Sequence, residues 1–150
     1  LRDQAAVENA QRELAGRLSY VGPVYGDAKD EFFRSIDVFL FPTRYAVEAQ
    51  PNVLFEALSY GVPVISNGRG CVASDIQRPS GYVVDQESDF ASEALAIIER
   101  WLSDPNEFDR ARSHALTYMR EMYEKGQRDL DMLITTIVCG SAVTNEPTNC

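Results

Sequence analysis

Two glutamates, Glu48 and Glu56, stand on either side of a Pro-Asn pair at residues 51 and 52. Proline suits the first position of a helix, because its missing N–H costs nothing there and its φ is already helical. We therefore expect a helix that begins at Pro51, runs through VLFEALS and ends at Gly61. The free N–H groups of its first turn and the helix dipole favour an anion such as phosphate. These N–H groups belong to Asn52, Val53 and Leu54.

The helix also separates the two glutamates. Glu48 falls in the preceding loop, whereas Glu56 lies ~7 Å along the helix axis from Pro51. They are therefore not an adjacent acid/base pair. A carboxylate in the loop can accept hydrogen bonds from sugar hydroxyls, and one on the helix can accept them from a ribose diol. The alternative is that both are simply solvated charges, which is the usual state of a glutamate taken alone.

The helix lies between two apolar segments, IDVFLFP and VPVIS. Continuous apolar runs of this length are typical of buried parallel strands. The order strand, loop, helix, strand places the loop and the helix start at the carboxyl edge of the sheet, where open α/β folds bind ligands. Arg44 follows the first strand and Arg69 follows the second, so either could contribute positive charge to a phosphate site there.

Residues 48 to 66 resemble the Glu-x7-Glu signature of the group 1 glycosyltransferases, which are retaining, nucleotide-sugar-dependent enzymes with two Rossmann-like domains (the GT-B fold). The resemblance extends upstream over YVGPVYGDAKDEFFRSIDVFLFPTRY and downstream over GVPVISNGRGC and SGYVVD. These ordered matches cover roughly residues 14 to 103, which is more specific than a single short motif.

The resemblance implies roles for individual residues. Glu48 corresponds to the family's first glutamate, which contacts the donor sugar near the reacting face, and is the catalytic candidate. Glu56 corresponds to the second, which binds the nucleotide ribose. Val24 and Tyr25 fall where the family flanks the base. Lys29 falls where some relatives carry a lysine close to the nucleotide, although a solvated lysine in the first turn of a helix is the alternative.

The sequence departs from the family pattern directly after Glu48. Relatives often have Gly-Phe-Gly there, whereas this chain has Ala49, Gln50 and Pro51. Pro51 removes one backbone donor, and the side chain of Gln50 could restore one. Gln50 is therefore counted among the donor-binding residues.

A second departure concerns the N-terminal segment RDQAAVENAQRELAGRL, which we expect to form a charged amphipathic helix ending near Gly16. In the family this helix follows two strands and a basic loop that neutralises the donor pyrophosphate, and a whole acceptor-binding domain precedes them. We expect these strands and the acceptor domain to be missing from this chain, which would be most of one half of such an enzyme, incomplete at its N-terminus, with the missing acceptor domain as its partner. An unpaired sheet edge would then favour self-association.

Composition narrows the other possible partners. The 150 residues suffice for one domain, and 14 Lys and Arg against 23 Asp and Glu give a net charge of -9. This charge argues against nucleic acid or an anionic membrane surface as a partner. Cys71, Cys139 and Cys150 have no spacing typical of a disulfide framework or a zinc site, and we expect no metal. Reduced thiols favour the cytoplasm, either free or at the inner face of a membrane through the missing domain. Cys71 is expected to be buried.

The fold class is α/β, with a Rossmann-like parallel sheet built from LSYVG, DVFLFP, VPVIS and GYVVD, flanking helices, and a helical C-terminal portion. One later helix begins at Ser88 as N-cap and has an apolar stripe of Phe90, Ala94, Leu95, Ile97, Ile98, Trp101 and Leu102. The next starts at Asp104-Pro105 and stops at Gly126, and QRDLDMLITTIV forms the last. Residues 1–138 form the donor-binding domain, and 139–150 a polar, disordered tail.

These patterns and the resemblance together imply the donor-binding domain of a retaining glycosyltransferase. Such an enzyme would move a sugar from a UDP-, GDP- or ADP-sugar to a saccharide or lipid acceptor, with no cofactor beyond its donor. Two alternatives stay open: an isolated, non-catalytic nucleotide-binding module, and a nucleotide-sugar epimerase of similar architecture. Fold alone does not choose among them.

Overall fold

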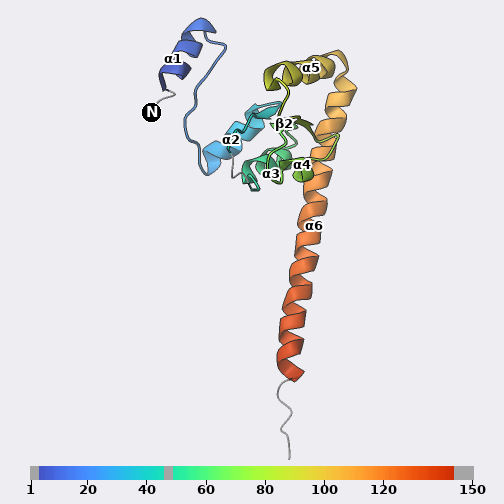
Figure 1. Ribbon diagram of the computed structural model, residues 1–150. Helices are drawn as coiled ribbons and strands as arrows, with labels where there is room; N and C mark the ends of the chain where they lie inside the picture. The colour runs from blue at the N-terminus through green and yellow to red at the C-terminus, as the bar shows by residue number, and fades with distance from the viewer. Residues whose placement is uncertain (1–3, 46–48, 144–150) are drawn as a thin grey trace, which may run out of the picture. The chain divides into compact units, whose positions relative to one another are not determined.

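The computed structural model describes residues 4–45 and 49–143, with side chains described for 5–45 and 49–138 (Figure 1). The chain divides into two compact units, Leu1–Ser35 and Ile36–Cys150. The second unit holds a parallel sheet flanked by helices, as the α/β prediction requires.

The first unit contains two helices, α1 (Gln4–Glu13) and α2 (Asp27–Ser35). Two aspartates lie in the first turn of α2 and Arg34 in its last turn, an arrangement that complements the helix dipole. Phe33 is the buried side chain of this helix. The predicted N-terminal helix is confirmed, and it ends three residues before Gly16.

The predicted strand LSYVG, residues 18–22, is wrong: the structure has no strand there. Gly22 has a φ of +68° and Pro23 follows it, so the extended conformation is broken where the strand would end. Tyr20 and Val21 are exposed, and within the described residues no backbone hydrogen bond joins this segment to a neighbouring strand. An apolar run becomes a strand only when a partner accepts its backbone hydrogen bonds.

The second unit contains three parallel strands in the order β1-β2-β3, namely β1 (Phe39–Phe41), β2 (Val64–Asn67) and β3 (Gly81–Val84). Phe39 pairs with Val64, and Val64 pairs with Gly81. The first three residues of β2 are buried, as expected of a central strand covered on both faces. Three of the four predicted strands are therefore confirmed, and β1 and β3 are the outer strands of the described sheet.

Helix α3 (Asn52–Ser59) connects β1 to β2, and the predicted stop at Gly61 is confirmed, since Gly61 directly follows the C-cap Tyr60. The N–H of Gly61 donates to the carbonyl of Leu58 at 3.0 Å, and the N–H of Val62 donates to that of Ala57 at 3.1 Å. These two bonds form a Schellman motif, which requires the left-handed φ of +69° at Gly61. Helix α3 thus returns the chain directly into β2.

Helix α5 (Phe90–Ser103) covers one face of the sheet. Its N-cap is Asp89 rather than the predicted Ser88, because the carboxylate of Asp89 accepts the N–H of Ser92 at 3.1 Å. Trp101 is buried in a cluster with Ile65 and Tyr82, so its predicted place in the core is confirmed. The predicted apolar stripe is too wide, since Leu95 and Leu102 are 55% and 77% exposed.

Helix α6 (Pro105–Val143) is a single helix, drawn in orange to red in Figure 1. It passes through Gly126 without a break, so the predicted stop and the separate last helix are wrong. Its first half packs on α3 and α5, whereas every side chain from 120 to 138 is exposed. The helix continues to Val143, five residues past the boundary predicted for the domain, and the tail beyond it lies outside the described residues. No helix in the described part of the chain is long and apolar enough to cross a membrane.

The junction of α5, α6 and β3 is held by polar groups as well as by packing. The hydroxyl of Tyr82 donates to Glu107 at 2.9 Å, and Nε of Arg100 donates to both oxygens of the same carboxylate at 2.9 and 3.0 Å. Burial, followed by the hydrogen bond to Glu107, raises the pKa of Tyr82 above its ordinary value. These contacts hold the helices that support the sheet from the side of β3.

Candidate functional site

The loops that follow the three strands meet at the carboxyl edge of the sheet. The N–H of Cys71 donates to the carbonyl of Ala49 at 3.0 Å, which joins the loop after β2 to the loop after β1. The N–H of Gly68 donates to the carbonyl of Val84 at 3.2 Å, and Nε2 of Gln86 donates back to the carbonyl of Gly68 at 2.6 Å. This edge is where open α/β sheets place their ligand sites.

The first turn of α3 begins at this edge. The helix begins at Asn52 and not, as predicted, at Pro51. Pro51 is the N-cap, because its ψ of 106° is extended rather than helical. The amide of Leu54 is not free, because it donates to the carbonyl of Pro51 at 3.1 Å. The expectation of three free N–H groups is corrected to two, those of Asn52 and Val53, which have no backbone acceptor among the described residues.

Two polar atoms, one at the end of β2 and one in the loop after it, are buried without a partner among the described residues. Oδ1 of Asn67 and Nε of Arg69 have no hydrogen-bond partner within the described part of the chain. Buried polar atoms are nearly always hydrogen-bonded, so each exception calls for an explanation. Among the described residues, Oδ2 of Asp75, Nε1 of Trp101 and Nδ1 of His114 are also buried without a partner. What makes Asn67 and Arg69 candidates for ligand contact is their place at the carboxyl edge of the sheet. Arg69 is half-buried, whereas Arg44, the other basic candidate, is exposed in the loop after β1.

A hollow of ≈ 550 Å³ opens between the ends of β2 and β3. Its floor is close-packed, since a Cβ on Gly68 would lie 2.9 Å from the side chain of Val83. We did not predict this hollow. Its position directly after two parallel strands is nevertheless where open α/β sheets bind ligands, so the strand pattern could have indicated it. The residues that line it are Gly68, Ala73, Val83, Val84, Asp85, Gln86 and Glu87.

Only one of the two glutamates of the signature lies among the described residues. Glu48, the catalytic candidate, lies outside the described residues. Glu56 is half-buried on α3, next to the buried Ala57, and its backbone carbonyl accepts the hydroxyl of Ser59 at 2.7 Å. Gln50 is exposed just before the helix. The roles assigned to Glu48, Glu56 and Gln50 stay predictions.

The three remaining site candidates belong to the first unit. Val24 is half-buried and Tyr25 is 80% exposed in the loop before α2, and Lys29 is half-buried in the first turn of α2. Gly26, with a φ of +53°, makes the turn between the loop and the helix, and its carbonyl accepts the N–H of Lys29 at 2.9 Å. Their roles at the base and the nucleotide also stay predictions.

The short helix α4 (Val72–Asp75) holds the loop after β2 in place. The hydroxyl of Tyr118 on α6 donates to the carbonyl of Asp75 at 3.1 Å. Burial, and then the charge of Asp75, raises the pKa of Tyr118 above its ordinary value. Cys71 at the start of α4 is exposed rather than buried as predicted, because its amide, not its side chain, makes the contact with the neighbouring loop.

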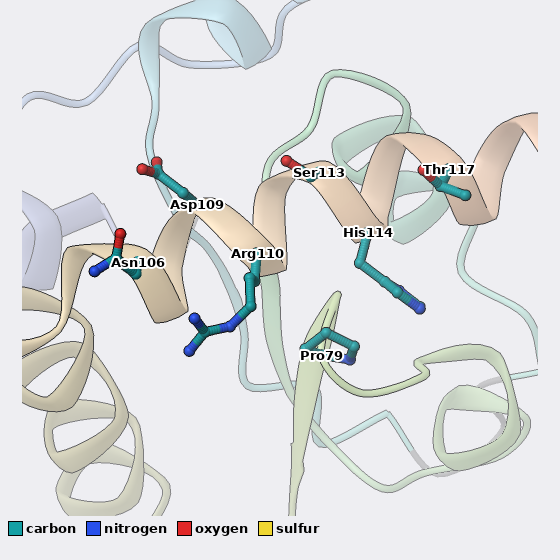
Figure 2. A pocket seen from close by; sticks show the side chains of 7 residues that line it. All are labelled: Pro79, Asn106, Asp109, Arg110, Ser113, His114 and Thr117. Atoms are coloured by element: carbon teal, nitrogen blue, oxygen red, sulfur yellow. The ribbon is translucent and has the colours of Figure 1, made fainter.

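A second hollow of ≈ 550 Å³ lies along α6 near Pro79. Pro79 precedes β3, so this hollow is at the amino end of that strand, away from the ligand edge. Figure 2 shows Arg110 and His114 pointing toward Pro79, while Asp109 and Ser113 point to the other side of the helix. These polar groups do not converge, and the described residues include no cluster able to hold a metal ion.

Comparison with known proteins connects this geometry to a family. Residues 2–103 match the family model described as "Glycosyl transferases group 1". Among curated proteins no similar sequence was found. Among solved structures, a sucrose-phosphate synthase from Thermosynechococcus elongatus is similar with a TM-score of 0.70 and 21% identity, over 93% of this chain and 35% of that one. At that identity the likeness concerns the fold, which matches one Rossmann-like half of a GT-B protein, and the chain spans about a third of the synthase's length.

Proposed function

The chain belongs to the group 1 glycosyl transferases, and we propose that it forms the donor-binding domain of a retaining enzyme of that family. The sugar would come from a UDP-, GDP- or ADP-sugar and pass to a saccharide or lipid acceptor held by a second, acceptor-binding domain. The observation that carries the proposal is the buried, unpaired Nε of Arg69, beside the hydrogen bond that joins the loops after β1 and β2.

In this proposal the start of α3 binds the diphosphate of the donor. The N–H groups of Asn52 and Val53 and the positive end of the helix dipole favour its negative charge. Arg69 adds a full positive charge in a chain whose net charge is -9, so the attraction for an anion is local to this edge. Arg44 follows β1 on the same edge and is the second basic candidate.

The reaction in this proposal proceeds on one face of the donor sugar. The acceptor hydroxyl attacks the anomeric carbon as the bond from that carbon to the diphosphate oxygen breaks. The departing phosphate takes the hydroxyl proton, so no metal or further cofactor is needed. The protein positions the reactants and stabilises the charge that develops on the phosphate. Glu48 would bind the sugar and Glu56 the ribose diol, with Val24, Tyr25 and Lys29 at the base and nucleotide.

Calorimetry with UDP, GDP and ADP tests donor binding by the whole chain. We expect at least one nucleotide to bind, and Glu56→Ala to weaken its binding by about tenfold or more, equal to about 1.4 kcal/mol, because the ribose loses its carboxylate acceptor. The matched control is Glu99→Ala on the exposed side of α5, which should leave the affinity unchanged.

Each outcome of the titration bears on a different part of the proposal. Failure of all three nucleotides to bind would contradict the donor domain and the non-catalytic nucleotide-binding module together. Equal affinity of the Glu56→Ala variant and the unchanged chain would contradict the ribose role alone.

Self-association through an outer strand also stays a prediction. In the described sheet β1 and β3 are the outer strands, and either could pair with a strand of a second copy.

A further inference from the structure

The second half of α6 exposes a group of large apolar side chains. Figure 1 shows this part of the helix continuing past α3 and the sheet, with no other described element of its unit beside it. Tyr123, Leu130, Leu133 and Ile137 are each between 48% and 68% exposed. Contiguous apolar patches on soluble proteins mark interaction surfaces, so this face of α6 calls for an occupant.

The spacing of these residues is that of a coiled coil. Steps of three and four residues alternate along α6 without interruption over three heptads. The residues at this spacing are Leu116, Met119, Tyr123, Gly126, Leu130, Leu133 and Ile137. A strict seven-residue repeat keeps its apolar positions in one seam against a second helix that winds around the first. The spacing therefore indicates a helix as the occupant of this face.

Helix α3 covers only the beginning of the repeat. Leu116 lies against Gly61, where an added Cβ would be 3.2 Å from the leucine side chain. A small hollow lined by Asn52 and Tyr123 marks where α3 begins beside α6. Every side chain from 120 to 138 is exposed. We call the exposed continuation of the repeat the α6 seam, and its members are Tyr123, Gly126, Leu130, Leu133 and Ile137.

The charges around the α6 seam favour a second copy of the chain over an anionic membrane. Residues 120–138 carry three basic and four acidic side chains, so their net charge is -1, whereas that of the chain is -9. A helix that binds an anionic membrane needs a predominantly basic polar face, which this one lacks. Two nearly neutral helices do not repel each other, although the chain as a whole is acidic.

The α6 seam is complementary to itself when two copies lie antiparallel, with the centre of symmetry between Leu130 and Leu133. In this register Leu130 of each copy lies against Leu133 of the other. Ile137 of each copy lies against Gly126 of the other, where the absent side chain leaves room for it. The two largest contacts and the one gap in the seam thus match.

The positions that flank the seam agree with this register. In an antiparallel pair each flank faces the same flank of the other helix, so Asp129 faces Thr136 and Gln127 faces Ile134. No like charges are opposed. A shift by one heptad toward the sheet would place Asp129 opposite its own equivalent and bring the end of the second helix against α3.

A parallel pair fits less well. It would place Gly126 against Gly126 and Tyr123 against Tyr123, which leaves a gap beside the bulkiest contact. It would also bring both copies of α3 to the same end of the helix pair, because α3 lies on the seam side of α6 at Leu116.

We propose that the chain forms a symmetric dimer in which the α6 seam of one copy pairs antiparallel with that of a second copy. The dimer does not rest on the proposed function, because none of the residues of the candidate functional site takes part in it. The seam that it uses is also distinct from the outer strands of the sheet.

Sedimentation equilibrium of the whole chain tests the dimer. The mean mass should rise with concentration from 16.8 kDa toward twice that value. Leu133→Glu puts a charge against the apolar Leu130 of the other copy, so dimerisation should require a concentration at least about tenfold higher. Met132→Glu is the matched control, because Met132 is a neighbouring apolar residue, 66% exposed and outside the seam, and this variant should dimerise as the unchanged chain does. Circular dichroism on both variants verifies that α6 is intact.

Disulfide trapping tests the register. In a chain whose Cys71, Cys139 and Cys150 are replaced by serine, Leu130→Cys and Leu133→Cys are prepared as two separate proteins. The antiparallel register brings these two positions together, so an oxidised mixture should contain the cross-linked pair, whereas neither protein should cross-link by itself.

Several results would overturn the proposal. A chain that stays monomeric at every concentration overturns the dimer, and binding of that monomer to vesicles of phosphatidylcholine and phosphatidylserine would identify a membrane as the occupant. Equal weakening by Leu133→Glu and Met132→Glu would indicate non-specific association. A dimer that Leu133→Glu leaves unchanged would indicate pairing elsewhere, such as through an outer strand. Cross-linking of the Leu130→Cys protein by itself would overturn the antiparallel register. None of these results affects nucleotide binding, which the titrations of the proposed function measure separately.

Discussion

At the scale of single residues, the N-cap of α5 lies one residue after the predicted position, at Asp89 instead of Ser88. Ser88 and Asp89 are both good N-cap residues, and the pattern alone does not separate them. In the structure the carboxylate of Asp89 accepts both the amide of Ser92 at 3.1 Å and its hydroxyl at 2.6 Å. The hydrogen bond from the Ser92 hydroxyl, followed by that from its amide, lowers the pKa of Asp89. Ser88 lies one residue outside the helix that Asp89 caps.

We therefore expect Asp89→Ala to lower the free energy of unfolding at pH 7. Since the folded-state pKa of Asp89 lies below its ordinary 3.8, the contribution is present above that value and is lost as the pH falls through the folded-state pKa. The difference between the variant and the unchanged chain in urea unfolding should thus shrink as the pH falls below 3.8. Ser88→Ala is the control, and an equal loss in both variants would contradict the assignment of the cap.

At the scale of elements, α6 is the one whose length the sequence patterns misjudged. A glycine after an amphipathic run is a common helix stop, because glycine adopts the left-handed conformation that ends many helices. Gly61 does so in this chain with a φ of +69°. Gly126 does not, and a Cβ added there would meet no atom within 4 Å. Two glycines in similar sequence contexts therefore have opposite structural roles.

Substituting alanine at these two glycines should have opposite effects. Gly126→Ala should stabilise the middle of α6 by about 0.5–1 kcal/mol, because it removes the entropic cost of a helical glycine. Amide hydrogen exchange around residue 126 should slow about 2- to 5-fold. Gly61→Ala should destabilise the chain, since alanine resists the positive φ and its Cβ would lie 3.2 Å from the side chain of Leu116. Faster exchange in the Gly126→Ala variant would indicate a helix break at that residue.

At the scale of the whole molecule, the sheet depends on one close approach that no local pattern reveals. Gly81 begins β3 and lies beside Val64 in the parallel ladder. A Cβ there would lie 2.6 Å from the carbonyl oxygen of Val64 and 2.6 Å from the side chain of Ile76. Strand β2 carries the loop with Arg69, so the position of the candidate site depends on this contact.

Gly81→Ala should lower the free energy of unfolding by about 2 kcal/mol or more, because the clashing carbonyl cannot move without breaking the β2–β3 ladder. Urea unfolding followed by tryptophan fluorescence measures this loss of stability. The ring centroid of Trp101 on α5 lies 5.7 Å from that of Tyr82, which follows Gly81 on β3. Gly126→Ala, the same substitution in open space, is the control for the added methyl group. An unaltered unfolding midpoint in the Gly81→Ala variant would contradict the close approach.

The sequence by itself determined the elements with strong periodic signals. Apolar runs predicted β1, β2 and β3, the Pro-Asn pair and Gly61 bounded α3, and Trp101 was placed in the core. The carboxyl edge of the sheet followed from the strand-helix order, because parallel strands joined by helices end on one side. These features depend on residues close together in the chain.

The tertiary structure alone decided the features that depend on distant residues. The apolar segment at 18–22 is not a strand because no described backbone pairs with it, and Leu95 and Leu102 are exposed because no other element covers them. The hydrogen bonds from Cys71 to Ala49 and from Tyr118 to Asp75 each join segments far apart in the sequence. The hydrophobic periodicity of the sequence indicates which face of an element is apolar. Which neighbour covers that face is decided by the packing of the whole chain.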